Sequence, residues 1–217
     1  TLFPYTTLFR SIDGARLLGV HLEGPYISPS KLGAQPGFAQ TPSVEALRAL
    51  TALAPIRIVT LAPELPGALE ATSALVAQGV RVQIGHSNAS YEQACAALQH
   101  GVSGFTHLFN AMSALHHRAP GVAGAALAHA AQAEIIPDLL HVHPGAIRAA
   151  LRAIPGLYCV TDSTSAATMP DGDYTLGAQR VIKCQGGVRL ADGTLAGSTL
   201  TMDQALRNLV FTLGLPL

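Results

Sequence analysis

The chain reads VRVQIGHSNASYEQACAALQHGVSGFTHLFNAM over residues 80–112. Two short runs rich in β-branched and aromatic residues end at His86 and His107, and an alanine-rich segment lies between them. Residues 90–93 (SYEQ) fit a helix capping box, and Gly101 fits the residue that follows a helix. The stretch predicts a strand–helix–strand unit with two parallel, adjacent strands. Because ligands bind beyond the carboxyl ends of such strands, both histidines are expected to face one crevice.

Strands and helices alternate along most of the remaining chain. Residues 174–195 do not follow this strand–helix alternation. Short runs of alternating apolar and polar residues, broken by glycines, predict a small antiparallel β-hairpin insert there, after the last parallel strand. An α/β barrel and an open doubly wound sheet both fit this order; six parallel strands are expected, whereas a closed barrel of this type has eight. The other expected strands are 17–22, 56–61, 134–140 and 157–161. Helices are expected at 41–53 with Thr41 as the cap, at 67–79, at 144–153, and at 201–214, where residues 201–204 (TMDQ) fit a second capping box.

The composition of the 217-residue chain excludes several classes of protein. Lys plus Arg (13) balances Asp plus Glu (13), so no basic field would attract nucleic acid. Hydrophobic residues make up 49% of the chain, yet no segment approaches the roughly 20 apolar residues of a membrane span. The three cysteines are widely spaced and form no CxxC pair, which favours a reducing compartment. A cytoplasmic protein is expected.

Polar residues stand at the ends of the predicted strands, whose interiors are almost purely apolar. A barrel that carries its catalytic groups on the carboxyl rim would produce this pattern. A carboxylate and two imidazoles with one open position are typical of a catalytic zinc-type site, and an aspartate can then move the proton of a metal-activated water. The pattern therefore indicates metal-assisted hydrolysis of an amide. The six residues are Glu23, Glu64, His86, His107, His141 and Asp162.

At five motifs the chain resembles the N-acetylglucosamine-6-phosphate deacetylases, a family of the amidohydrolase superfamily. The resemblance extends from Arg16 to the end of the chain, in the family's order. It implies an incomplete (β/α)₈ TIM-type barrel of the metal-dependent amidohydrolase kind. The motifs are residues 19–25 (GVHLEGP), 85–89 (GHSNA), 106–112 (THLFNAM), 160–162 (VTD) and 195–198 (LAGS).

The resemblance also implies a role for each matching residue. Glu23, His86 and His107 would hold one divalent metal ion, most simply Zn²⁺, and Asp162 would be the general base and acid. The substrate would be an amino-sugar phosphate and the complete enzyme a homodimer. The residues implied in recognition of the sugar phosphate are Asn110, the backbone of Ala111, Arg118 and His141, some of them across the dimer interface.

The chain departs from the family pattern at several places. Gln35 stands where many members carry a histidine; its amide can donate to a substrate oxygen but cannot carry a proton. Leu139 replaces a usual glycine and is expected to crowd the pocket. The family's N-terminal strands and C-terminal continuation have no counterpart, so this chain alone is expected to be inactive. Residues 1–10 look like a non-native tail, and residues 11–217 are expected to form one partial barrel domain.

Simpler interpretations of these residues stay open. Asp162 could cap a turn with Ser163 and Thr164, and Arg118 could be an ordinary solvated loop residue. Another amidohydrolase, acting on a different N-acyl or cyclic amide, would share the metal site. A non-catalytic sugar-phosphate binding protein would keep the pocket and bind its ligand without metal.

Overall fold

The computed structural model describes residues 16–216. The tail expected at residues 1–10 therefore lies outside the described residues. None of the helices in the described part combines the length and the apolar character that a membrane crossing requires. All three cysteines are free thiols.

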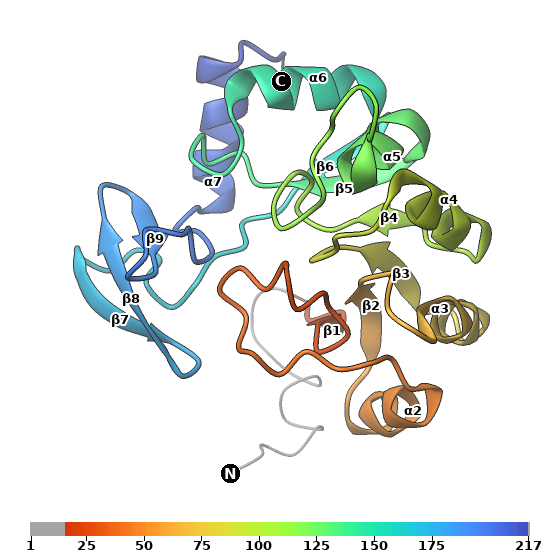
Figure 1. Ribbon diagram of the computed structural model, residues 1–217. Helices are drawn as coiled ribbons and strands as arrows, with labels where there is room; N and C mark the ends of the chain where they lie inside the picture. The colour runs from red at the N-terminus through yellow and green to blue at the C-terminus, as the bar shows by residue number, and fades with distance from the viewer. Residues whose placement is uncertain (1–15, 217) are drawn as a thin grey trace.

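Six parallel strands follow one another around an arc in chain order (Figure 1). The first four form one sheet, and the last two pair with each other. The backbone N–H of Leu108 donates to the carbonyl of Glu134 at 2.8 Å and links the two sheets. The strands are β1 (Val20–Glu23), β2 (Ile56–Leu61), β3 (Arg81–Ile84), β4 (Gly104–Phe105), β5 (Gln132–Ile135) and β6 (Gly156–Cys159).

Five helices alternate with these strands and lie on the outer side of the arc (Figure 1). The core between strands and helices is mostly aliphatic and includes Val59, Val82 and the aromatic Phe105, all fully buried. Each such side chain contributes about 1.5–3 kcal/mol through burial. The capping box at Ser90 forms as predicted, with both reciprocal hydrogen bonds present. The helices are α2 (Val44–Leu53), α3 (Ala68–Ala77), α4 (Tyr91–Gln99), α5 (Gly121–His129) and α6 (Pro144–Ala153).

A three-stranded antiparallel sheet follows β6 and stands to one side of the arc (Figure 1). It consists of β7 (Gly172–Leu176), β8 (Gln179–Cys184) and β9 (Gly187–Arg189). The turn between β8 and β9 holds Gln185 and Gly186 at φ values of 51° and 76°, which is the backbone pattern of a tight two-residue hairpin.

The structure corrects the sequence prediction around His141. The strand expected at 134–140 is β5, which ends at Ile135, so His141 lies in the following loop. Pro137 has no backbone N–H to offer a neighbouring strand. Asp138 bends the chain further, because its Oδ1 accepts from the backbone N–H groups of Leu140 and His141 at 2.9 and 2.8 Å.

Two helix starts also differ from the prediction. Helix α2 is capped by Ser43, whose hydroxyl accepts from the N–H of Ala46, and not by Thr41. The predicted capping box at Thr201 is absent, because the Gln204 amide donates to Asn208 instead. Helix α7 (Met202–Arg207) continues as a π-helical turn, η1 (Asn208–Thr212). Two strand ends differ slightly as well. Strand β1 ends at Glu23, one residue beyond the expected 17–22, and β6 ends at Cys159, two residues short of the expected 157–161.

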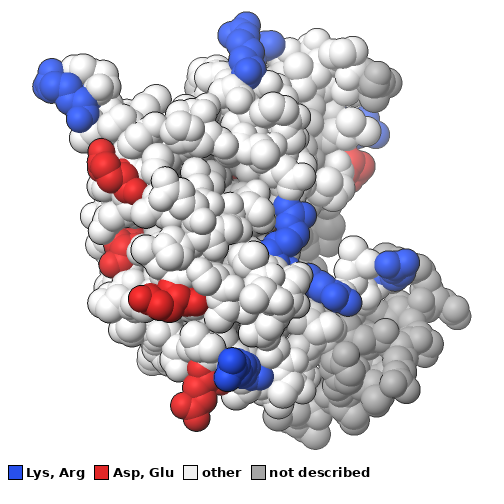
Figure 2. All heavy atoms as spheres, turned by 90° about the vertical axis from the view of Figure 1, so that its right-hand side faces the viewer, with Lys and Arg blue, Asp and Glu red and all other residues white. Residues whose placement is uncertain are grey.

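Charged side chains are sparse on the face that Figure 2 shows, where basic and acidic groups are scattered among uncharged surface. This agrees with a charged fraction of 12%.

Candidate active site

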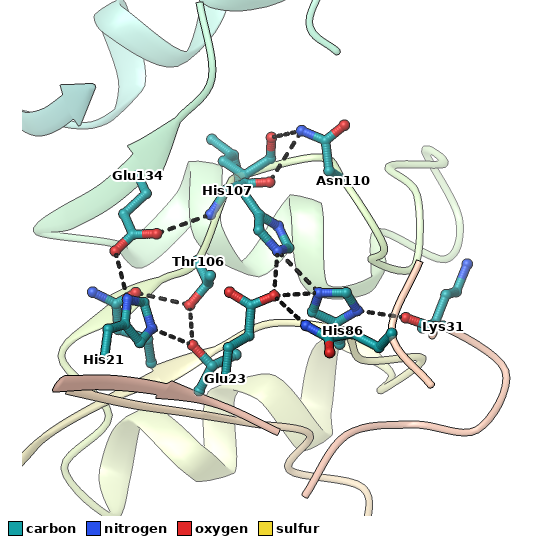
Figure 3. A network of polar contacts seen from close by, with 12 residues as sticks. His21, Glu23, Lys31, His86, Thr106, His107, Asn110 and Glu134 are labelled. Carbon is teal, nitrogen blue, oxygen red and sulfur yellow. Dashed lines mark hydrogen bonds and ion pairs between the residues drawn. The ribbon is translucent and has the colours of Figure 1, made fainter. Parts of the chain in front are cut away.

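Three side chains from three strands converge at the carboxyl ends of the arc (Figure 3). Glu23 is the last residue of β1, His86 lies two residues beyond β3, and His107 lies two residues beyond β4. The Nε2 atom of His86 is 2.8 Å from Oε1 of Glu23 and 3.1 Å from Nε2 of His107, which is itself 3.5 Å from the same carboxylate oxygen. The ligand atoms of all three lie within 4.8 Å of one another.

The backbone turns sharply where each strand delivers its functional residue. His86, His107 and Asp162 have φ values of 47°, 32° and 48°, in the left-handed region. Such conformations cost about 1–3 kcal/mol each and cluster at functional sites. Gly85 allows the backbone just before His86 to lie close to the side chains of Thr60 and Thr106. A Cβ at this position would meet them at 2.7 and 2.8 Å.

The ring of His86 is oriented by the loop that follows β1. Its Nδ1 lies 2.7 Å from the carbonyl oxygen of Lys31, and because a carbonyl only accepts, Nδ1 carries the hydrogen. Nε2 is therefore the ring atom directed at Glu23 and His107. A backbone carbonyl on the second nitrogen is the usual way in which a metal-binding histidine is held.

The electrostatics of the cluster couple Glu23 to both histidines. Burial alone would raise the pKa of the Glu23 carboxyl, but hydrogen bonds and charge from His107 and His86 outweigh it and hold that pKa far below its ordinary range. Burial would lower the pKa of His107, but Glu23 raises it to about 9. The half-buried Glu23 carboxylate and the buried His107 imidazole therefore stabilise each other's charged form.

The donor set fits a divalent metal ion. In tetrahedral coordination with bonds of about 2.0–2.1 Å, neighbouring ligand atoms stand roughly 3.3 Å apart. The separations of 2.8, 3.1 and 3.5 Å bracket this value. Two imidazoles and a carboxylate can therefore hold an ion and leave a fourth position open.

A cavity of about 570 Å³ opens beside this cluster. Arg118 is not among its lining residues; the side chain is exposed, and Nη1 lies 2.8 Å from Nε2 of His117. The structure brings the other eight predicted site residues to the cavity: Glu23, Gln35, His86, His107, Asn110, Ala111, His141 and Asp162. A larger cavity, of about 780 Å³, lies near the opposite ends of β3 and β5 and contains none of them.

Gln35 and Asn110 reinforce the cluster from two loops. The Gln35 amide donates to Oε1 of Glu23 at 3.1 Å. The Asn110 amide donates to the carbonyls of His107 and Leu108 at 3.2 and 3.3 Å. Ala111 has a φ of 48°, and its carbonyl accepts from the N–H of Ser87 at 3.0 Å.

His141 forms a close pair with Asp138. Nδ1 of His141 lies 2.6 Å from Oδ2 of Asp138, which fixes the hydrogen on Nδ1. Burial raises the pKa of Asp138, but the hydrogen bonds from His141 outweigh it, so the pKa is lowered overall. Leu139 adopts a φ of 67° and packs against the hydrophobic core. It does not line the cavity, so the expected crowding by this side chain is wrong.

Asp162 lies at the mouth of the cavity, with its carboxylate near the charges of His107 and Glu23. Loss of hydration raises its pKa above the ordinary 3.8, and the charge of His107 opposes that rise. Among the described residues, no hydrogen bond uses this carboxylate to cap Ser163 or Thr164; the backbone carbonyl instead accepts from the N–H of Ser198 at 2.7 Å.

Sequence reasoning missed the contribution of the antiparallel sheet. Leu176 and Gly177, from the β7–β8 hairpin, line the cavity beside the loop after β1. The Gln179 amide donates to the carbonyl of Ala34 at 2.9 Å and ties the sheet to that loop. Only the three-dimensional fold reveals this contact, because it joins residues 145 positions apart.

Comparison with known proteins finds relatives of this chain among amino-sugar-phosphate deacetylases. The chain is 45% identical over 203 residues to N-acetylglucosamine-6-phosphate deacetylase of Lysinibacillus sphaericus, covering 91% of this chain and 52% of that protein. The chain is homologous to part of these deacetylases. An N-acetylgalactosamine-6-phosphate deacetylase of Escherichia coli O157:H7 is equally similar, 45% identical over 207 residues, with 93% of this chain and 55% of that protein covered. No family model matches the chain.

Solved structures of N-acetylglucosamine-6-phosphate deacetylases share the α/β fold. The enzyme of Pasteurella multocida superposes with a TM-score of 0.89 at 35% identity, over 96% of this chain and 55% of its own. A mutant enzyme of Mycobacterium smegmatis, in complex with N-acetyl-D-glucosamine-6-phosphate, gives a TM-score of 0.85 at 37% identity, over 90% and 53%. The chain thus spans about half the length of the curated relatives it matches.

Proposed function

We propose that the protein carrying this chain hydrolyses the acetamide of N-acetylglucosamine 6-phosphate to glucosamine 6-phosphate and acetate. The observation that carries the proposal is the convergence of Glu23, His86 and His107 beside a cavity that Asp162 also lines. Homology to deacetylases over about nine-tenths of the chain supports this substrate class. We also propose a cytoplasmic location, which three free cysteines support.

The metal ion in this proposal is one Zn²⁺ held by Glu23, His86 and His107. Nitrogen and carboxylate donors in a three-ligand set with an open position favour zinc. When bound, zinc supplies a Lewis acid that lowers the pKa of water to about 7 and polarises a carbonyl.

Asp162 is the proton carrier of the proposed reaction. Its carboxylate accepts a proton from the attacking water and returns it to the amide nitrogen as the C–N bond breaks. The raised pKa of Asp162 brings this carboxyl closer to the range in which it can release the proton again. The Gln35 amide, beside Glu23, would donate to the substrate carbonyl oxygen.

Residues that line the cavity would bind the sugar phosphate. His141, held by Asp138, directs Nε2 away from that contact, and Asn110 and the Ala111 backbone line the same space. Arg118 is exposed and does not line the cavity beside Glu23, His86 and His107 in the same chain. We therefore assign its guanidinium to the phosphate bound by a second copy in a homodimer, where paired charge-assisted hydrogen bonds suit a phosphate.

The architecture proposed for this chain is part of one (β/α)₈ barrel domain, residues 11–217, with residues 1–10 outside it. The outward placement of α2–α6 around the parallel strands supports it. The antiparallel sheet β7–β9 would be an insert in that barrel.

A second candidate substrate is N-acetylgalactosamine 6-phosphate. A specific observation supports it. The deacetylase that acts on this sugar phosphate in Escherichia coli O157:H7 is as similar to this chain as the N-acetylglucosamine-6-phosphate deacetylase of Lysinibacillus sphaericus is. The two sugars differ in one hydroxyl configuration and carry the same reacting groups. Side-by-side turnover of both sugars decides between them.

Acetate release from N-acetylglucosamine 6-phosphate tests the proposed function. Asp162→Asn should lower turnover by about 10²–10⁴-fold while zinc binding is retained. Asp173→Asn, at an exposed aspartate that pairs with Arg180, is the control and should turn over normally. Near-normal activity of Asp162→Asn would assign the proton transfer to another group. Activity that persists after removal of all metal would contradict the metal site.

A further inference from the structure

A continuous set of polar side chains crosses the interior of the arc beside the metal-site cluster, and Figure 3 labels His21, Thr106 and Glu134 among its members. We name it the polar ring. Each parallel strand, or the residue directly after it, contributes one member. Four of the six are fully buried, namely Thr60, Gln83, Thr106 and Glu134. The polar ring comprises His21, Thr60, Gln83, Thr106, Glu134 and Tyr158.

The hydrogen bonds of the polar ring run in one direction, toward Glu134. The Tyr158 hydroxyl donates to Oε1 of Glu134 at 3.1 Å. The Gln83 amide nitrogen donates to Tyr158 at 2.9 Å. Gln83 then accepts from Thr106 at 2.8 Å, which leaves Thr106 to accept from Thr60 at 2.6 Å.

His21 begins this sequence of donors. Its Nε2 lies 2.7 Å from the Thr60 hydroxyl, which must accept because its own hydrogen is already used. Nδ1 of the same ring lies 3.8 Å from Oε1 of Glu134, so the two ends of the set lie close together, at a distance too long for a hydrogen bond. Burial first, and then the charge of Glu134, raise the pKa of Tyr158, which keeps it a neutral donor.

Glu134 connects the polar ring to the metal-site cluster. Its Oε2 accepts from the backbone N–H of His107 at 3.3 Å, and its own carbonyl accepts from the next N–H, that of Leu108, at 2.8 Å. One residue of β5 therefore holds two consecutive amides of the segment that turns His107 into the cavity. That segment is strained, with φ at 32° for His107.

His107 depends on this backbone support more than His86 does. The second ring nitrogen of His86 donates to the Lys31 carbonyl. Nδ1 of His107 is buried and meets no hydrogen-bond partner among residues 16–216. No second-nitrogen contact within the described chain therefore orients the His107 ring, and its aim follows from where the backbone places it.

We propose that Glu134 is a positioning residue, which fixes His107 for metal binding by holding its backbone N–H. The inference rests on the proposed metal site. It assigns Glu134 no contact with substrate, and its effect is on metal affinity through His107.

Three variants of the protein that carries this chain separate positioning from general stability. Glu134→Met is of similar length and removes the acceptor for the His107 N–H. Glu134→Gln keeps a carbonyl oxygen that can accept the same hydrogen. Thr60→Val is isosteric and breaks the polar ring at β2, where no bond to His107 is involved.

Zinc affinity, measured by competition with a chromophoric chelator in the absence of substrate, is the readout. Glu134→Met should bind Zn²⁺ about tenfold or more weakly, within the range known for partners that orient metal ligands. Glu134→Gln should restore most of that affinity. Thr60→Val should lower the melting temperature and leave zinc affinity unchanged. Parent-like affinity in Glu134→Met, or an equal loss in Thr60→Val, would overturn the proposal.

Amide hydrogen exchange gives a second readout that requires neither metal nor a variant. The His107 N–H of the metal-free parent should exchange slowly because Glu134 holds it, and fast exchange there would also overturn the proposal. The proposed function fails differently. A parent that binds zinc and does not deacetylate contradicts the substrate assignment alone, and a parent that binds no zinc contradicts the metal site.

Discussion

Asp138 and His141 show how one side-chain pair can shape both a turn and the lining of a cavity. Asp138 accepts two backbone N–H groups with one oxygen and the His141 ring with the other. The side chains are only 9% and 7% exposed, so their hydrogen bond is shielded from water. Loss of the carboxylate charge would loosen the turn that brings His141 to the cavity.

Because of this pair, we expect part of the free energy of unfolding to depend on pH in the acid range. Folding lowers the pKa of Asp138 below its ordinary 3.8. The stabilisation is therefore present above about pH 3.8 and is lost as the pH falls through the folded-state value. Asp138→Asn should destabilise the protein by a constant amount from neutral pH down to about pH 4, and by progressively less below it. Urea unfolding at a series of pH values measures the difference.

Asp173→Asn is the control for that series. Its carboxylate is exposed and lies 2.9 Å from Arg180 at the surface, an arrangement that contributes little. A gap between parent and Asp138→Asn that stays constant below pH 3.8 would show that Asp138 acts by shape and not by charge.

At the level of elements, local signals in the sequence predicted most of the parallel sheet. Strand β2 matches its predicted bounds, and β3 and β4 lie side by side in parallel as the histidine spacing indicated. β-Branched and apolar runs define such strands because both of their faces are buried. The convergence of His86 and His107 followed from this topology alone.

Contacts between residues far apart in the sequence could not be predicted from local patterns. Glu134 is one polar residue in an apolar run, and its partners His107 and Tyr158 are 27 and 24 positions away. The Thr201 capping box has the right residues, yet Gln204 pairs with Asn208, which in turn donates to the carbonyl of Pro137. Tertiary contacts decided both cases.

The two capping sequences predict different costs for the same kind of substitution. Ser90→Ala removes a hydroxyl that accepts from the N–H of Gln93 at 3.2 Å, so helix α4 should lose about 1 kcal/mol. Thr201→Ala is the matched control, because Thr201 makes no side-chain cap to α7. Its cost should be clearly smaller. Thermal or urea unfolding of both variants tests this, and equal losses would mean that the Ser90 capping box contributes nothing measurable.

Across the whole molecule, the six parallel strands leave two edges. Within the described residues β1 pairs only with β2, and β6 pairs only with β5. An edge strand offers unpaired backbone donors and acceptors to any other chain. Leu17 and Leu18, just before β1, are 43% and 61% exposed and add apolar surface beside that edge.

These edges predict that a polypeptide of these 217 residues, made alone, self-associates and deacetylates poorly. Pairing through β1 would be weakened by a charge beside that edge, as in natural edge strands protected by lysine. Leu18→Lys should therefore reduce association, since Leu18 is exposed and the substitution leaves the core intact. Phe211→Lys, at a residue 79% exposed in η1 and outside either edge strand, is the control. Light scattering over about 1–100 μM, the range in which exposed strand edges aggregate, gives the measurement. A single monomeric species at every concentration, or equal association in both variants, would show that β1 is not the surface through which the chains meet.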